Sequence, residues 1–423
     1  MATKKSWTVM VYLAGDNNLD GAGVVDLKEM KQVGSNDRLN ILAQFDRAGA
    51  KAKTIRYCLR KKTPLAKDAV KRLGETNMGD PKVLEDFVSW SVSNYPAEHY
   101  MLVLWNHGAG WDDANLYQGD VFGGAAPPVT RKGRTLSSTR GGGRALRSAH
   151  VHAGISRTRR SLFRTTVAQA VRSRAIAFDD QAQDFLDNIE LKRVLLGIKK
   201  MLKRKIDILG MDACLMSMLE VAYQIKDTAA YQVASEESEP GEGWPYDRIL
   251  KLLAAKPSMS PGELAADVVN QYLASFGSDE DVTQSALNLA ALDPLAQAVD
   301  SLAIALKGAL GDSAARTGII TARTQVQEYS RPYDDYCDLL DLCELLAQGV
   351  HEPMVGQACL AVKQAAAQAL VASGFKGSKV SHSKGISIYF PKRKLSPLYG
   401  SLDFIKKTSW SRFLQAYLAG IGR

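Results

Sequence analysis

The chain has 423 residues, of which 46% are hydrophobic and 23% are charged, and its formal net charge is +9. This length allows two or three domains with a large apolar core, and the composition excludes a disordered or fibrous chain. The five Cys show neither the C-x-x-C spacing of a zinc or redox site nor a secreted disulfide framework, so we expect free, reduced thiols.

The positive charge is concentrated in one segment. Residues 121–178 contain eleven Arg, one Lys and no Asp or Glu, so the rest of the chain is slightly acidic. A Gly-Gly-Gly run at 141–143 and many Ser and Thr predict that much of this segment is a mobile surface loop. We therefore expect a mildly acidic globular protein with one Arg-rich insert, not a chain that is basic all over.

The first 120 residues alternate between strand and helix patterns. Strands are predicted at residues 7–13, 40–45, 54–59 and 100–105, and helices near residues 24–32 and 81–92. This alternation predicts an α/β sandwich with a mostly parallel central sheet. The run at 7–13 is too short to cross a membrane, and Asp16-Asn17-Asn18 follows where a signal-peptide cleavage site would lie. We therefore expect a cytoplasmic protein that does not bind membranes, with secretion by another route as the open alternative.

After the insert the pattern changes once more. A helix is predicted at 184–203, a strand at 206–211, a helix at 215–223 and a strand at 231–234. Beyond residue 250, alanine-rich helical periodicity dominates at 261–274, 295–310 and 355–371, with one late strand at 385–390. We predict an α/β domain over residues 1–250, which contains the insert, and a mainly helical C-terminal subdomain over residues 251–423.

Two apolar strands end in reactive residues. The strand at 100–105 runs into Asn106, His107 and Gly108, and the strand at 206–211 runs into Asp212 and Cys214. Short, continuous apolar runs are typical of strands buried on both faces of a parallel sheet, where functional residues gather at the carboxyl ends. A lone Cys is more often a buried core thiol, but Cys and His together favour a nucleophile pair.

Gly108 adds a second element to this site. It has no side chain to block a bound carbonyl, and its N–H together with that of Cys214 predicts an oxyanion hole. None of the other His and Cys residues shows the spacing of a metal site, so we expect no metal ligands and no cofactor. A calcium requirement cannot be read from the sequence.

Several motifs carry a resemblance to a known family. They are VYLAGDNNL at 11–19, WNHGAGW at 105–111, MDACLM at 211–216, SEE through PGEGWPY at 235–246, and GISIYFP at 385–391. With these motifs the chain resembles the clostripain family of cysteine peptidases, in the wider caspase-like clan. These motifs are spread over nearly the whole chain and occur in the same order as in the family. The resemblance implies a caspase-like α/β/α sandwich.

The resemblance also implies roles for single residues. His107 would be the general base and acid, Cys214 the nucleophile, and Asp212 the acid that lines a primary pocket for Arg or Lys. A carboxylate in the pocket is the expected partner of a guanidinium or ammonium group. Glu242 is a second candidate for the pocket acid, with a solvated loop charge as the equal alternative, and Asp16 is a weaker third.

The resemblance further implies maturation by self-cleavage between His107 and Cys214, where the Arg-rich insert lies. The prediction is therefore an endopeptidase that cleaves peptides and proteins after Arg or Lys and processes its own insert. The chain differs from the well-known members of the family, which are secreted, in its Arg-rich insert and in the lack of an obvious signal peptide.

Two alternatives belong to other functional classes. The Arg-rich insert could bind nucleic acid or an acidic partner through phosphate or carboxylate contacts, although its few aromatic residues count against the stacking of bases. The chain could also be a catalytically silent scaffold, although such a scaffold has no need for Cys214, His107 and Asp212 together.

Overall fold

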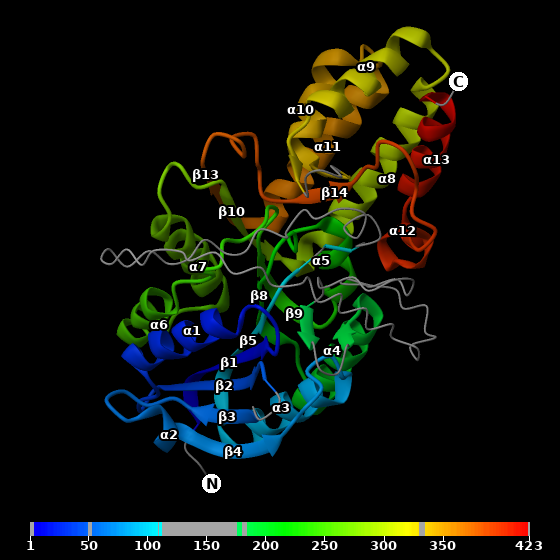
Figure 1. Cartoon of the computed structure of the whole chain (residues 1–423). Helices are drawn as coiled ribbons and strands as arrows, with labels where there is room; N and C mark the ends of the chain where they lie inside the picture. The colour runs from blue at the N-terminus through cyan, green and yellow to red at the C-terminus, as the bar shows by residue number, and fades with distance from the viewer. Residues whose placement is uncertain are drawn as a thin grey trace, which may run out of the picture.

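The computed structural model describes residues 4–49, 53–108, 110–111, 176–179, 184–329 and 335–421. Its centre is a nine-stranded sheet with helices on both faces (Figure 1). The five central strands are parallel, and the strands at both edges are antiparallel. In spatial order they are β13 (Leu370–Lys376), β10 (Val282–Asn288), β9 (Ala229–Ala234), β8 (Ile206–Asp212), β5 (Ala97–Trp105), β1 (Lys5–Gly15), β2 (Leu39–Arg47), β3 (Thr54–Cys58) and β4 (Ala69–Gly74).

Side chains of β1 explain why helices cover both faces of this sheet. Val9 and Val11 lie in one hydrophobic core, whereas Met10 and Tyr12, which point the other way, lie in a second core. The first core is covered by α1 (Asp20–Val33), α6 (Tyr246–Ala255) and α7 (Pro261–Ser275). The second is covered by α3 (Pro81–Asn94), α4 (Asn188–Leu202) and α5 (Leu219–Ile225), so the predicted α/β sandwich is confirmed.

The region after residue 250 contains more strands than the sequence predicted. Besides the late strand β14 (Ser387–Tyr389), it holds β10 and β13 of the main sheet and the short strands β11 (Glu328–Tyr329) and β12 (Tyr336–Asp338). Because β10 pairs with β9, the main sheet continues across the boundary predicted at residue 250. The helix predicted at 355–371 ends at Ala369, where β13 begins directly with no intervening Gly or Pro to mark the change.

Helices form most of the remaining C-terminal region. They are α8 (Leu292–Ala309), α9 (Ser313–Gln325), α10 (Leu339–Gly349), α11 (Pro353–Ala369), α12 (Asp403–Lys407) and α13 (Trp410–Ile421). Within the described parts of the chain, one segment, Leu289–Ala309, is long and apolar enough to span a membrane by length and composition alone, and 50% of its most apolar window is buried. That segment packs against α11 and α13, as a core helix does.

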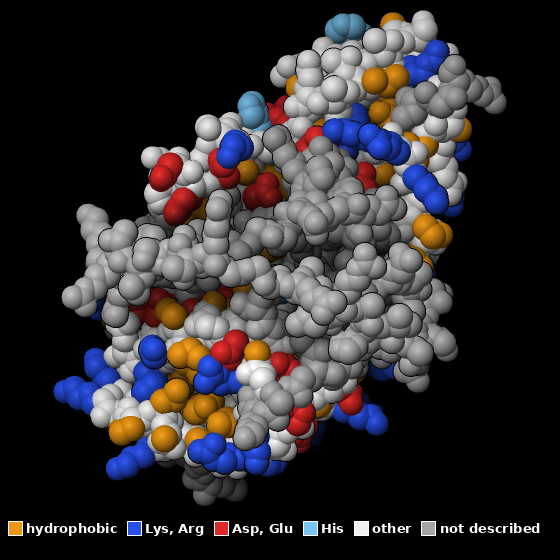
Figure 2. Space-filling view, viewed as in Figure 1, with side chains coloured by type: hydrophobic (Ala, Val, Ile, Leu, Met, Phe, Trp, Pro, Cys, Tyr) orange, Lys and Arg blue, Asp and Glu red, His pale blue; other side chains and the backbone are white. Residues whose placement is uncertain are grey.

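The smaller elements complete the fold. They are α2 (Leu65–Asp68), the 3-10 turns η1 (Leu289–Ala291) and η2 (Tyr399–Ser401), and a hairpin of β6 (Ile176–Asp179) and β7 (Asp184–Leu186). Of the predicted Arg-rich insert, only residues 176–178 in β6 are described, so its prediction as a mobile processing loop falls outside the described residues. Figure 2 shows both basic and acidic side chains on the described part of one face.

Candidate active site

The pairing of β5 with β8 brings the two predicted strand ends together. The strands are parallel neighbours, and Trp105 at the end of β5 lies opposite Asp212 at the end of β8. His107 and Cys214 each follow two residues after these strand ends. The backbone N–H of Asn106 donates to the Asp212 carbonyl at 3.3 Å and extends the contact beyond the strands.

A cavity of about 200 Å³ opens at this edge of the sheet. The described residues that line it come from four chain segments: Asn18, Leu19, Trp105, Asn106, His107, Gly108, Asp212, Ala213, Cys214, Ser238, Glu239, Pro240, Gly241 and Gly243. His107, Cys214, Gly108 and Asp212 are therefore brought together, as the sequence predicted.

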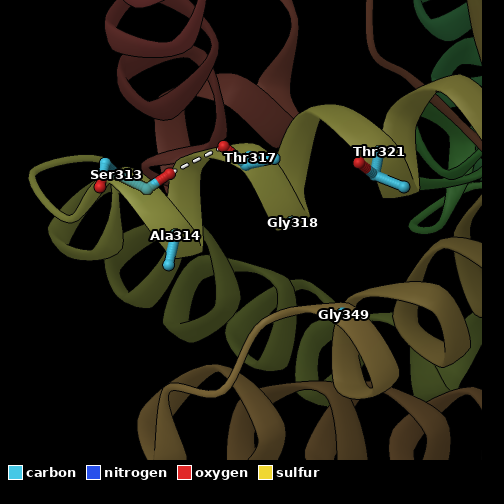
Figure 3. Close-up of a pocket in the computed structure, with 6 residues that line it drawn as sticks. All are labelled: Ser313, Ala314, Thr317, Gly318, Thr321 and Gly349. Carbon is cyan, nitrogen blue, oxygen red and sulfur yellow. Dashed lines mark hydrogen bonds between the residues drawn. The ribbon is translucent and has the colours of Figure 1, made fainter.

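A larger groove of about 470 Å³ lies elsewhere, between α9 and the end of α10 (Figure 3). Its walls consist of small residues, and the Thr317 hydroxyl donates to the Ser313 carbonyl of its own helix at 2.9 Å. The described residues of this groove include no titratable side chain. The smaller cavity is therefore the candidate active site, because it alone of the two combines a thiol, an imidazole and carboxyl groups.

Asn18 orients the imidazole of His107. Its Oδ1 lies 2.8 Å from His107 Nε2, and because an amide oxygen only accepts, this nitrogen carries the hydrogen. In the neutral ring the basic nitrogen is then Nδ1. The Asn106 side chain holds the same loop, because its Nδ2 donates to the Ala14 carbonyl and its Oδ1 accepts from the His107 backbone N–H.

Cys214 sits on a strained turn at the end of β8. The next residue, Leu215, has φ 64°, a left-handed conformation that costs a residue with a side chain about 1–3 kcal/mol. The turn is held by the buried Leu215, whose N–H donates to the Glu237 carbonyl at 3.2 Å. The Glu239 N–H donates to Cys214 Sγ at 3.2 Å, which places a backbone donor on the sulfur.

Gly108 lies directly against the backbone of Cys214. A Cβ added at this position would lie 2.3 Å from the Cys214 carbonyl oxygen and 3.0 Å from its nitrogen. Any other residue would push apart the loops that carry His107 and Cys214, so the glycine is required by close approach. Gly108 and Cys214 therefore lie against each other in the cavity wall, and the oxyanion hole formed by their N–H groups stays a prediction.

Asp212 lies in the cavity wall and is only 4% exposed. Its Oδ2 accepts from the Tyr246 hydroxyl at 2.7 Å and from the Trp244 N–H at 3.4 Å. Burial raises the pKa of Asp212 to about 6, against the effect of these donors and of a hydrogen bond with Glu239. Gly243, with φ 58°, covers the carboxyl group so closely that a Cβ would lie 3.1 Å from Oδ1.

Three further acids surround Asp212. Glu239 lines the same cavity, and burial together with its contact to Asp212 raises the pKa of Glu239 well above its ordinary value. From α1, burial and the charges of Asp212 and Glu29 raise the pKa of Asp26 to about 9. Burial also raises the pKa of Glu29. Of these three acids, Glu239 alone lines the cavity together with Asp212, so these two carboxyl groups are the acids that a ligand in the cavity would meet.

The sequence model of the clostripain family matches residues 11–123 and 165–417 of the chain. The chain belongs to the clostripain family. Clostripain of Hathewaya histolytica is 26% identical over an alignment of 399 positions that covers 80% of this chain and 65% of that relative. The chain thus matches slightly less than two thirds of the length of clostripain. The family predicted from the sequence is confirmed.

Solved structures of C11 proteases share the fold of this clostripain-family chain. A secreted C11 cysteine protease from Bacteroides thetaiotaomicron, in complex with an irreversible peptide inhibitor, is 20% identical, with a TM-score of 0.61 over 99% of this chain and 100% of its own. An inactive zymogen C11 protease from Parabacteroides distasonis is 19% identical, with a TM-score of 0.62 over 96% and 99%. These likenesses support the fold, while the predicted cytoplasmic location stays a prediction.

Two of the predicted pocket acids of the clostripain-family site lie apart from the cavity. Glu242 is exposed and does not line the cavity, although its neighbours Gly241 and Gly243 do. Asp16 is buried beside Asp46 and Glu75, and one oxygen from each of these three lies within 4.8 Å of the others. Asp16 therefore lies in this group of three acids and does not line the cavity.

The sequence prediction missed Asn18 and Glu239. Asn18 follows β1, and Glu239 follows β9, and both strands are parallel to β5 and β8, so their ends reach the same edge. The signal that could have found both residues was therefore strand order. Strand order is not readable from one sequence, because it depends on which strands pair.

Proposed function

We propose that this clostripain-family chain is a cysteine endopeptidase that hydrolyses peptide bonds after Arg or Lys. The observation that carries the proposal is one cavity that holds Cys214, His107 and Asp212 at the ends of two paired strands. A thiol beside an imidazole provides a nucleophile and a proton carrier, and a buried carboxyl group provides the partner for a cationic side chain.

The first step forms an acyl-enzyme. His107 accepts the thiol proton of Cys214, and the resulting sulfur anion attacks the carbonyl carbon of the scissile bond. The N–H groups of Gly108 and Cys214 donate to the oxyanion that develops. His107 then gives its proton to the leaving amine, and the C–N bond breaks. The Asn18 amide keeps the ring in one orientation through both transfers.

The second step releases the product. A water molecule, from which His107 removes a proton, attacks the thioester carbon, and the same two N–H groups stabilise the second oxyanion. The C–S bond breaks, the acid product leaves, and the proton on His107 returns to the sulfur. The enzyme regains its starting state with one water consumed.

Specificity for Arg or Lys is assigned to Asp212. The side chain before the scissile bond enters the cavity beside the nucleophile, and Asp212 lies two residues before Cys214 in the same wall. A substrate cation would meet an acidic floor made by Asp212 and the neighbouring Glu239. The alternative pocket acid, Glu242, would have to reach in from an exposed loop.

Self-processing within residues 121–178 is part of the proposal. The segment joins the two catalytic strands and holds eleven Arg, so a site that prefers Arg has substrate bonds at high local concentration. One relative with this fold is described as an inactive zymogen, which agrees with activation by cleavage.

The test is a panel of fluorogenic peptides that differ only in the residue before the scissile bond. Arg and Lys peptides should be hydrolysed, and the Cys214→Ala and His107→Ala variants should lose several orders of magnitude in rate. Matched Gln and Glu peptides serve as controls for charge. Absence of hydrolysis for every peptide by a folded preparation whose insert also stays intact would reject the peptidase and favour the silent scaffold.

A further inference from the structure

Two carboxyl groups meet at the floor of the cavity. Asp212, at the end of β8, and Glu239, in the loop after β9, are in hydrogen-bonding contact. Glu239 Oε1 accepts from Gln284 Nε2 at 3.2 Å. Glu239 Oε2 is buried and meets no N–H or hydroxyl donor among the described residues. Two buried carboxylates in contact cannot both stay charged, so one of them carries a proton and donates it to the other.

The hydrogen bonds around the pair assign this proton to Glu239. Asp212 receives the Tyr246 hydroxyl and the Trp244 N–H, and both donors favour the charged form of its carboxyl group. Among the described residues, the one donor that the Glu239 carboxyl group receives from outside the pair is the neutral amide of Gln284. In agreement, burial and the neighbouring Asp212 raise the pKa of Glu239 well above its ordinary value.

The charged and titratable groups that face the pair come from several elements. They are Cys214 after β8, Tyr246 on α6, Asp26 and Glu29 on α1, Tyr272 on α7, and His107 across the cavity. His107 is the only basic side chain among the described residues that line the cavity. The surroundings are therefore mostly acidic, and they hold the proton on the pair until a cation arrives.

The free oxygens of the pair match the donors of a substrate guanidinium. Asp212 Oδ2 already accepts two hydrogen bonds, which leaves Oδ1 to accept from Glu239 in the empty pair and from a cation once that proton has left. A guanidinium presents five N–H donors in a flat fork and binds two oxygens side by side. A second oxygen is available from Glu239 Oε2, once its proton has left.

We propose that Glu239 is the second specificity residue of the primary pocket, and that it exchanges its proton for the cationic side chain of the substrate. This inference rests on the proposed function and adds to it the release of one proton when the cationic side chain binds. When the cation enters, the O–H bond of Glu239 breaks and the proton passes to bulk water. Asp212 and Glu239 then face the cation as two carboxylates, and the net charge of the occupied pocket equals that of the empty one.

The exchange makes the affinity of the pocket for a cation increase with pH. One proton leaves for each cation that binds, so the affinity for the cation should rise tenfold for each unit of pH over the range in which the empty pair is protonated. Replacing Glu239 with Gln keeps an N–H donor toward Asp212 and removes the exchangeable proton. The affinity of that variant should then change little with pH above the titration of Asp212.

The experiment uses benzamidine as the cation and the full-length Cys214→Ala protein as the parent, so that no turnover occurs. Isothermal titration calorimetry at one pH, in two buffers with different ionisation enthalpies, counts the protons released on binding. We expect close to one proton for the parent and close to none for the added Glu239→Gln change. The matched control is Glu98→Gln, an exposed acid at the opposite end of β5, which should behave as the parent.

Each outcome tests either the proton release or the pocket itself. Binding of benzamidine to the parent without proton release overturns the shared proton and leaves the Arg or Lys pocket standing. Absence of binding overturns the pocket itself and, with it, this inference. If Glu239→Gln does not fold, the infrared difference spectrum of the parent with and without benzamidine should show the loss of one carbonyl band of a protonated carboxyl group, and a difference spectrum without this loss overturns the proposal.

Discussion

Replacing Asp212 with Asn tests the primary pocket with the smallest change in shape. The amide keeps an oxygen that can accept from the Tyr246 hydroxyl, now 2.7 Å from Oδ2, and removes the negative charge. Loss of one partner from a desolvated charge pair costs about 2–5 kcal/mol. Since a factor of ten corresponds to about 1.4 kcal/mol, kcat/KM for Arg peptides should fall roughly 30-fold to several thousand-fold.

The assay compares peptides with Arg, Lys or Gln before the scissile bond. The loss should be confined to the cationic peptides, and Cys214 should react with iodoacetamide at the rate of the unmodified enzyme, because the catalytic loops keep their contacts. Tyr246→Phe is the matched control: it removes a hydrogen bond to Asp212 but keeps the charge, so its loss should be smaller.

The pH dependence follows from the same carboxyl group. Burial raises the pKa of Asp212 to about 6, and protonation removes the charge that attracts the substrate cation. For the unmodified enzyme, kcat/KM for Arg relative to Gln peptides should therefore decrease as the pH falls through about 6, and the Asp212→Asn variant should lose this decrease. Normal Arg hydrolysis by Asp212→Asn, together with its loss in Glu242→Gln, would refute the reasoning and place the pocket acid on the exposed loop.

Three other predictions concern the catalytic loops and the insert. Asn18→Ala should lower kcat by at least about tenfold with little change in KM, and Asn18→Asp, which keeps an acceptor for the imidazole, should recover part of the loss; equal losses in both variants would argue against positioning. Gly108→Ala should reduce kcat/KM by about 100-fold or more, measured with Arg peptides, because its Cβ would lie 2.3 Å from the Cys214 carbonyl oxygen. Purified wild-type protein should run as two associated fragments with a new C-terminus at an Arg or Lys within 131–174, whereas Cys214→Ala should stay one chain of 46.1 kDa, as mass spectrometry would show; an active single-chain wild type contradicts self-processing.

The central strands and the two reactive residues were predictable because they depend on local patterns. β5 and β8 consist mostly of apolar residues, and the placement of their sequence neighbours His107 and Cys214 needed only the rule that parallel strands end at one edge. Glu239 was not predictable from its own surroundings, because an acid in a polar loop is usually solvated. The folded chain leaves Glu239 half-buried and encloses its Oε2 beside Asp212, and that contact depends on tertiary structure.

The strands β13 and β10 were not predicted from the sequence, for a different reason. β13 follows α11 without a break and alternates between half-exposed and exposed residues, so its sequence has neither a turn signal nor a buried run. β10 combines Thr, Gln, Ser and Asn with apolar residues, and it is buried because neighbouring strands and helices cover it. In both cases the tertiary environment decided the conformation.

The order of strands in the main sheet divides the protein into two halves, which meet where β5 pairs with β8. The strands of this sheet that precede the Arg-rich segment form the half that ends at β5, and those that follow it form the half that ends at β8. The first half supplies His107, Gly108 and Asn18 to the cavity, and the second supplies Cys214, Asp212 and Glu239. Neither half contains all of the proposed catalytic residues. Two separately expressed chains should therefore be inactive alone and should hydrolyse Arg peptides once they associate, so that hydrolysis would measure the association of the two halves.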